Sequence, residues 1–165
     1  MIGRLLPLLL LLATLPGCGL RPVYAGGSSG TAAQMFQTIT VAPIEGQSGW
    51  LVRNKLIDRL GQAGTAQAAY RLDVTLDDNL TAFGIRGDRA ATRERRTLRA
   101  RYQLVSLTQG QVVLDATAGS DAGIDIVSSD YATVAAEQTA LENLSGIVAD
   151  QIVARLATFA NSSGR

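Results

Sequence analysis

The sequence predicts an α+β domain of order β-α-β-β-β-α, with two helices packed on one face of a four-stranded, mostly antiparallel sheet. Polar and apolar residues alternate in three consecutive segments, which indicates strands with one buried and one solvent-exposed face. In two other segments apolar residues recur every three or four positions, as on the buried side of a helix. Short turns between alternating segments favour antiparallel hairpins. All of these elements lie within residues 36–160, which form the predicted domain.

The first expected strand spans Phe36–Ile44. Ile39 and Val41 alternate there with threonines, which is the pattern of a strand whose apolar side faces a core. Pro43 has no backbone N–H to donate to a neighbouring strand. The end of this strand is therefore expected at an edge of the sheet.

The first expected helix runs from about Ser48 to Ala63. The Ser48 hydroxyl is suited to accept a backbone N–H as the N-cap, and Gly64 is suited to the left-handed turn after the helix. Trp50, near the helix start, is expected either in the core or as an anchor at an interface. The apolar face holds Val52, Leu56, Ile57 and Leu60.

Three longer strands follow, and then a long helix. A hairpin loop at Phe83–Thr92 separates the first two of these strands and is long enough to reach a partner. The last helix is expected from Ser129 or Asp130 to Phe159, and residues 161–165 are expected to be disordered. The inward-facing positions of the strands are Tyr70, Leu72, Val74 and Leu76, then Leu98, Ala100, Tyr102 and Leu104, then Val112, Leu114, Ala116 and Ala118.

The composition excludes several classes of function. The chain has 165 residues, no histidine and one cysteine, so it holds no histidine-activated nucleophile, no histidine-ligated metal and no intramolecular disulfide. Its formal charge of +1 argues against a nucleic-acid partner. No acid–base pair, phosphate-binding loop or calcium loop is visible. We therefore expect no enzyme activity, no catalytic residues, no cofactor and no metal.

Residues 1–17 are expected to be a signal peptide, and Cys18 is expected to carry lipid. Arg4 precedes an apolar run that is too short to span a membrane, which takes roughly 20 residues. The segment Leu15-Pro16-Gly17-Cys18 resembles the lipobox that is cut by lipoprotein signal peptidase. This resemblance implies a diacylglyceryl thioether and an N-acyl chain, which together anchor a protein firmly to a membrane. The alternative is an ordinary signal peptide followed by an incidental cysteine.

Residues 18–35 are expected to be a flexible tether between the lipid and the domain. They contain the stretch Gly-Gly-Ser-Ser-Gly, which has the composition of a flexible linker. The residue after Cys18 is glycine rather than aspartate. By the sorting pattern known for such lipoproteins, this favours the outer membrane.

The segment GCGLRPVY at residues 17–24, followed by strand, helix, three strands and helix, resembles the LptE family of lipopolysaccharide-assembly lipoproteins. The resemblance implies a protein that its lipid holds at the periplasmic face of the outer membrane. It implies a large β-barrel of the LptD type as the partner, whose lumen the protein plugs. It also implies lipopolysaccharide as a ligand and a role without catalysis.

Arginine is concentrated between residues 86 and 101, which hold seven of the fourteen arginines. Four of them share one parity and would line the solvent-exposed face of a strand with roughly 7 Å between alternate residues. Guanidinium groups suit phosphate oxygens, which lipid A carries. Three roles remain open for the row. It could bind lipopolysaccharide, or it could contact acidic groups inside the barrel. It could also be a solvated surface whose arginines pair only with acids on neighbouring strands. The four arginines are Arg93, Arg95, Arg99 and Arg101.

Two hypotheses follow for the function. The first is an outer-membrane lipoprotein that partners an LptD-type β-barrel in assembling lipopolysaccharide. The second is an auxiliary lipoprotein of another envelope complex, such as a lipid-transport ABC system or a secretion channel. Co-purification with an outer-membrane barrel would favour the first, and co-purification with an inner-membrane complex would favour the second.

Overall fold

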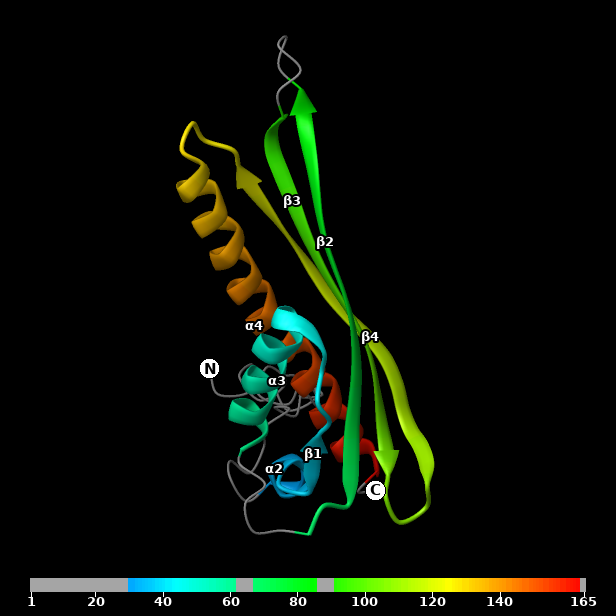
Figure 1. Cartoon of the computed structure of the whole chain (residues 1–165). Coiled ribbons are helices and arrows are strands. Elements are labelled where there is room, and N and C mark those ends of the chain that lie inside the picture. The colour runs from blue at the N-terminus through cyan, green and yellow to red at the C-terminus, as the bar shows by residue number, and fades with distance from the viewer. Residues whose placement is uncertain (1–29, 62–66, 86–90, 164–165) are drawn as a thin grey trace, which may run out of the picture.

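The computed structural model describes residues 30–61, 67–85 and 91–163. The expected signal peptide, Cys18 and most of the expected tether lie outside these residues. The described part holds one four-stranded sheet and three helices (Figure 1), which confirms the predicted α+β class and adds one short helix. In chain order the elements are α2 (Thr31–Phe36), β1 (Ile39–Val41), α3 (Gly46–Leu60), β2 (Tyr70–Ile85), β3 (Ala91–Ser106), β4 (Gln111–Asp125) and α4 (Asp130–Ser163).

The sheet is mostly antiparallel, as predicted, and its strands follow the order of the chain. β1 pairs in parallel with the start of β2, where Ile39 lies opposite Tyr70. β2, β3 and β4 form an antiparallel meander, because each long strand pairs with the next over nearly its whole length. β1 and β4 are therefore the two edge strands among the described residues.

The helices cover one face of the sheet and leave the other face open (Figure 1). α4 packs on β3 and β4, α3 packs on α4 and on β1, and α2 packs on α4. Burial along β3 alternates accordingly: Leu98, Ala100, Tyr102 and Leu104 are buried against the helices. Residues of the opposite parity face away from the helices. The predicted inward-facing positions of this strand are confirmed.

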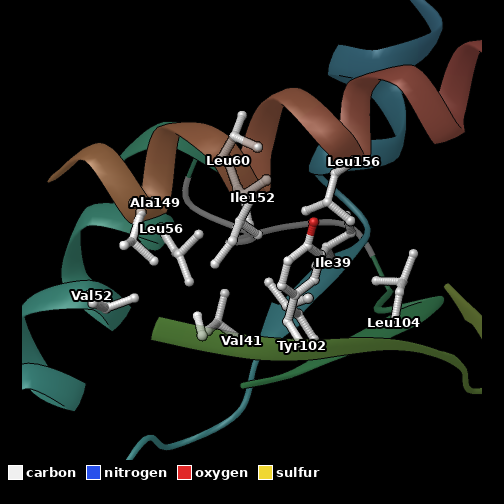
Figure 2. Close-up of a cluster of buried hydrophobic side chains, with 14 of the residues drawn as sticks. Ile39, Val41, Val52, Leu56, Leu60, Tyr102, Leu104, Ala149, Ile152 and Leu156 are labelled. Carbon is white, nitrogen blue, oxygen red and sulfur yellow. The ribbon is translucent and has the colours of Figure 1, made fainter. Parts of the chain in front are cut away.

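The core lies where β1, α3, β3 and α4 meet. Figure 2 shows the ring of Tyr102 pointing from β3 toward Leu156 of α4, with Ile39 of β1 beside it. Burying a leucine or an aromatic side chain stabilises a fold by about 1.5–3 kcal/mol each, so this contact region holds the two layers together. Fully buried members include Val52 and Leu56 from α3, and Leu141, Leu144, Val148, Ile152 and Leu156 from α4.

The start of the domain differs from the prediction. Residues Thr31–Phe36 form helix α2 and not the end of a tether and the start of a strand. Ala32 and Phe36 are buried against the rest of the core, so this helix belongs to the folded domain. The Thr38 hydroxyl donates a hydrogen bond to the carbonyl of Met35 at 2.7 Å and closes the turn into β1. β1 is consequently three residues long instead of nine.

The boundaries of α3 also differ. Glu45 stands at the N-cap without a capping side-chain bond, in place of the expected Ser48. Gly61, with φ of 77°, follows the last helical residue three positions before the expected Gly64. Gly64 itself lies outside the described residues. At the far end, residues 161–163 continue α4, although the sequence predicted disorder from residue 161.

The hairpin of β2 and β3 is longer than predicted. The two strands stay paired up to Ile85 and Ala91, so half of the expected loop at Phe83–Thr92 belongs to the strands. The paired ends extend past the first turn of α4, and α2 lies at the opposite end of the sheet (Figure 1). Among the described helices, none is both long and apolar enough to cross a membrane.

Candidate functional site

All four arginines of the predicted row lie on the open face of the sheet. Arg93, Arg95, Arg99 and Arg101 are exposed, and the strand parity that the sequence predicted places them on the side opposite to the helices. We call this row, with the open-face side chains of β2 and β4 beside it, the arginine face. β3 has a long strand on each side, so the row runs along the middle of the open face and not along an edge of the sheet.

Three arginines of the row form ion pairs with aspartates of β4. Arg93 donates to Asp125 at 2.7 Å, Arg99 to Asp121 at 3.1 Å and Arg101 to Asp115 at 2.8 Å. The register explains these partners, because Asp125 lies directly opposite Arg93 and the other two aspartates lie two residues from the direct partners of theirs. The pairs are exposed, so water screens them and each one stabilises the fold only weakly.

The sequence left open that acids on neighbouring strands pair with the row. On β2 these acids are Asp73 and Asp77, and both bond to residues of their own strand instead. Arg71 donates to Asp73 at 2.8 Å on the same strand. Asp77 lies opposite Arg99 in the register, but it accepts a hydrogen bond from Asn79 at 2.7 Å. The acids that neutralise the row therefore come from the strand on its other side.

Arg95 is the exception in the row. Its register partners are Thr81 on β2 and Gly123 on β4, neither of which carries a charge. Its guanidinium carbon lies 5.4 Å from the centre of the Phe83 ring, which is a cation–π distance. Within the described ranges Arg95 forms no ion pair, so it is the arginine of the row that an anion reaches without displacing a carboxylate.

Two of the paired aspartates, Asp115 and Asp121, remain charged at neutral pH. Hydrogen bonds from Arg101 and Gln103 lower the pKa of Asp115 to about 2. Hydrogen bonds from Thr97 and Arg99 likewise lower the pKa of Asp121. Protonation near pH 7 therefore does not release these arginines, and an incoming anion has to compete with the aspartates directly.

The arginine face as a whole is close to neutral. Its described residues include five arginines and five aspartates, and a shallow depression of about 570 Å³ lies near Arg99 and Arg101. Small residues opposite these two arginines, Thr117 and Gly119, leave this space. In the described ranges no three acidic or cysteine side chains gather as a metal site would require. The arrangement is suited to binding through charge pairs. The charged residues are Arg71, Arg93, Arg95, Arg99 and Arg101, with Asp73, Asp77, Asp115, Asp121 and Asp125.

Sequence reasoning missed the role of Arg96, which has the opposite parity. It lies on the helix side of the sheet, pairs with Asp78 at 2.8 Å and donates to the carbonyl of Glu137 on α4 at 3.2 Å. The side chains of Arg96 and Asp78 are only 16% and 19% exposed. Burial and the nearby Glu137 carboxylate raise the pKa of Glu94 in the same region. The sequence did contain a signal for this role. Arg95 and Arg96 are adjacent, so in a strand their side chains point to opposite faces of the sheet.

Fold and site together define a small α+β binding domain with one helix-covered and one open, charged sheet face. The sequence profile of the LptE family, described as lipopolysaccharide-assembly, matches residues 36–156. The chain therefore belongs to the LptE family of lipopolysaccharide-assembly lipoproteins, which confirms the resemblance seen in the sequence. A search of curated protein sequences finds no match.

Solved structures of bacterial lipoproteins share the fold. A protein of Caulobacter crescentus, described as a lipoprotein, is 25% identical, with a TM-score of 0.67 over 82% of this chain and 98% of its own. Rare lipoprotein B of Shewanella oneidensis is 10% identical, with a TM-score of 0.59 over 78% and 98%. A minor lipoprotein of Acinetobacter baumannii is 14% identical, with a TM-score of 0.59 over 74% and 92%. The latter two show similarity of fold alone.

Proposed function

We propose that this chain acts in lipopolysaccharide assembly as a non-catalytic lipoprotein of the outer membrane, in partnership with an LptD-type β-barrel. The observation that carries the proposal is the family match, which spans β1 to β4 and α4 as far as residue 156. The match favours this hypothesis over an auxiliary role in another envelope complex. In the proposal, lipid on Cys18 anchors the domain at the periplasmic face of the membrane.

Within this function we propose that the arginine face contacts phosphate groups of lipopolysaccharide, with Arg95 as the first point of contact. Arg95 forms no ion pair among the described residues, although its charge acts on Asp121, while Arg93 and Arg99 are held by aspartates. Alternate residues of a strand are about 7 Å apart, so a phosphate on Arg95 lies within reach of Arg93 as well. Guanidinium groups bind phosphate through paired, charge-assisted hydrogen bonds.

Contact with acidic groups inside the barrel and simple solvation of the row are the competing roles. The aspartate pairs support solvation for the paired arginines, because those charges are already balanced. Arg95 separates solvation from the other two roles, because a ligand or a partner would use a guanidinium outside an ion pair and a solvated surface would not need one. Its exposed position on the ladder makes it replaceable without disturbing the core.

The first experiment concerns the anchor and the partner. Mass spectrometry of the mature N-terminus is expected to find Cys18 as the first residue with acyl chains attached. A tagged, membrane-extracted chain is expected to co-purify with a large outer-membrane barrel. Recovery of an unmodified Cys18 thiol, or of an inner-membrane complex in place of the barrel, would contradict the proposal.

The second experiment measures lipopolysaccharide binding to the purified chain. Arg95→Gln is expected to weaken binding several-fold, and Asp121→Asn is expected to strengthen it, because the neutral amide no longer competes for Arg99. Arg155→Gln is the matched control, since Arg155 is exposed on α4 and lies outside the arginine face. Equal affinities in all variants would remove the phosphate contact. Loss of barrel co-purification in Arg95→Gln, with unchanged lipopolysaccharide affinity, would assign the row to the partner.

A further inference from the structure

A groove of about 250 Å³ lies between the outer edge of β1 and one flank of α3. We call it the β1–α3 groove. Ile39 and Val41 form its floor from β1, and Arg53, Ile57 and Gly61 form its wall from α3 and the residue after it. It lies at the opposite edge of the sheet from β4, so it is separate from the aspartates that pair with the arginine face.

Within residues 30–61, 67–85 and 91–163, the backbone groups at the outer edge of β1 have no partner strand. The Thr38 carbonyl accepts bonds from Ala69 and Tyr70, and the Ala42 N–H donates to the carbonyl of Leu72. Backbone groups of a strand point alternately to its two sides. Those of Ile39 and Val41 therefore point away from β2, and no strand of the described chain lies there. This geometry is that of a strand ready to pair with another extended chain.

Arg53 supplies a cation to the same groove. Its Nε is buried, yet among the described residues it has no hydrogen-bond acceptor. Arg59 on the same helix provides the contrast, because it pairs with Asp150 of α4. A buried guanidinium N–H without an acceptor is uncommon in proteins, because buried donors are normally hydrogen-bonded. The groove therefore offers a donor for an acceptor that is not part of the described chain.

An exposed aromatic side chain lies about one helical turn before Arg53 on α3. Trp50 is 64% exposed and precedes Arg53 by three residues and Ile57 by seven, which places all three on one flank of α3. Tryptophan and arginine are the residues that most often carry the binding energy of protein interfaces. The sequence allowed Trp50 as core or as interface anchor, and its exposure excludes the core.

We propose that the β1–α3 groove binds an extended peptide segment of a partner protein, which pairs with β1 as a fifth strand and places a carboxylate on Arg53. The edge of β1 would form main-chain hydrogen bonds with the peptide, and the flank of α3 would select its side chains. Peptides that add a strand to a sheet are usually bound in this way. The acidic side chain follows from charge complementarity with the Arg53 guanidinium, because Arg53 lines the groove. The β4 edge is a poorer site, because the Gln151 side chain already occupies its backbone at Gly119.

The experiment uses the mature chain and the peptide acetyl-Thr-Val-Thr-Glu-Thr-Val-Thr-amide. In an extended peptide the two valines and the glutamate share one face, which can turn toward α3. Trp50 is the single tryptophan of the chain, so its fluorescence reports binding directly. We expect a shift of that fluorescence and slower hydrogen exchange at the amides of Ile39 and Val41. No change at these amides at millimolar peptide would overturn the proposal.

Two matched comparisons test the carboxylate. A peptide with glutamine in place of glutamate is expected to bind the unaltered chain about tenfold more weakly, which corresponds to about 1.4 kcal/mol. Arg53→Gln is expected to abolish that difference between the peptides, whereas Lys55→Gln, on the far flank of α3, is expected to preserve it. Equal binding of both peptides to the unaltered chain would overturn the ion pair without depending on any variant folding. The chain could also form a dimer in the absence of peptide. If Arg53→Gln abolished such a dimer, the occupant of the groove would be a second copy of the chain, and the proposal of a partner peptide would be overturned.

Discussion

The side-chain amide of Gln151 on α4 bonds both backbone groups of Gly119 on β4. The Gly119 N–H donates to Oε1 at 2.9 Å, and Nε2 donates to the Gly119 carbonyl at 3.3 Å. A side chain thus takes the place of a further strand at the middle of the β4 edge. A Cβ at residue 119 would lie 2.5 Å from the Arg99 Cδ, so the Arg99 side chain would have to shift for a larger residue to fit there.

Gln151→Leu is expected to lower the free energy of unfolding by about 1 kcal/mol, because two backbone groups lose their partners. Hydrogen exchange at the Gly119 amide is expected to become faster at the same time. Gln138→Leu on the same helix is the control, since its amide bonds only side chains, those of Gln47 and Glu142. Unchanged exchange at Gly119 in Gln151→Leu would show that water satisfies this edge equally well.

Arg96→Met is expected to destabilise the domain by roughly 1.5–3 kcal/mol, because it leaves the largely buried Asp78 carboxylate without its partner. The double variant Arg96→Met with Asp78→Leu is expected to recover part of this loss, since two apolar side chains replace the pair together. Urea unfolding measures both. Arg93→Met is the control and is expected to cost at most about 1 kcal/mol, because its pair is exposed. Equal losses for Arg93 and Arg96 would contradict this ranking.

The pH dependence of the arginine face is expected to lie in the acid range. The pKa of Asp115 is about 2 in the folded chain, against an ordinary value of 3.8, because Arg101 and Gln103 donate to the carboxylate. A lowered pKa gives stability that is present above pH 3.8 and is lost as the pH falls toward 2. Carboxyl titration by NMR checks the value. Arg101→Ala is expected to return the pKa of Asp115 toward 3.8, and Arg93→Ala is expected to leave it unchanged.

Ser145→Ala is expected to stabilise the domain by up to about 1 kcal/mol. The Ser145 side chain is fully buried in α4, and its hydroxyl has no hydrogen-bond partner among the described residues. Removing an unsatisfied buried hydroxyl relieves its desolvation cost, and alanine is also the better helix former. Ser106→Ala is the matched control: its hydroxyl accepts the Gln109 N–H, so the same change there is expected to destabilise. A lower melting temperature for Ser145→Ala would indicate a hidden partner.

The sequence predicted the sheet well because strict alternation specifies which residues face inward. Leu98 and Tyr102 were placed in the core, and Arg99 and Arg101 on the open face, by parity alone. The same reasoning could not find the partners of the arginines. Those depend on the register between β3 and β4 and on the competing local bonds of Asp73 and Asp77, which no single-strand pattern contains.

Short elements and edges escaped prediction for a related reason. Residues Thr31–Phe36 are too few to show a helical period, and α2 is held by the burial of Ala32 and Phe36 against distant parts of the chain. The sequence suggested a loop from Phe83 to Thr92, but β2 and β3 stay paired up to Ile85 and Ala91. The burial of α2 depends on contacts between segments far apart in the sequence, as does the position of β1 at an edge of the sheet.

The position of α2 determines which end of the domain would lie nearer to a lipid on Cys18. The twelve residues from Cys18 to Gly30 reach at most about 40 Å, whereas a strand as long as β2 covers about 53 Å. This stretch is shorter than β2, so an acylated Cys18 could not itself reach the hairpin end of the sheet, which lies opposite α2 (Figure 1). The lipid would thus hold the domain by the end that carries α2.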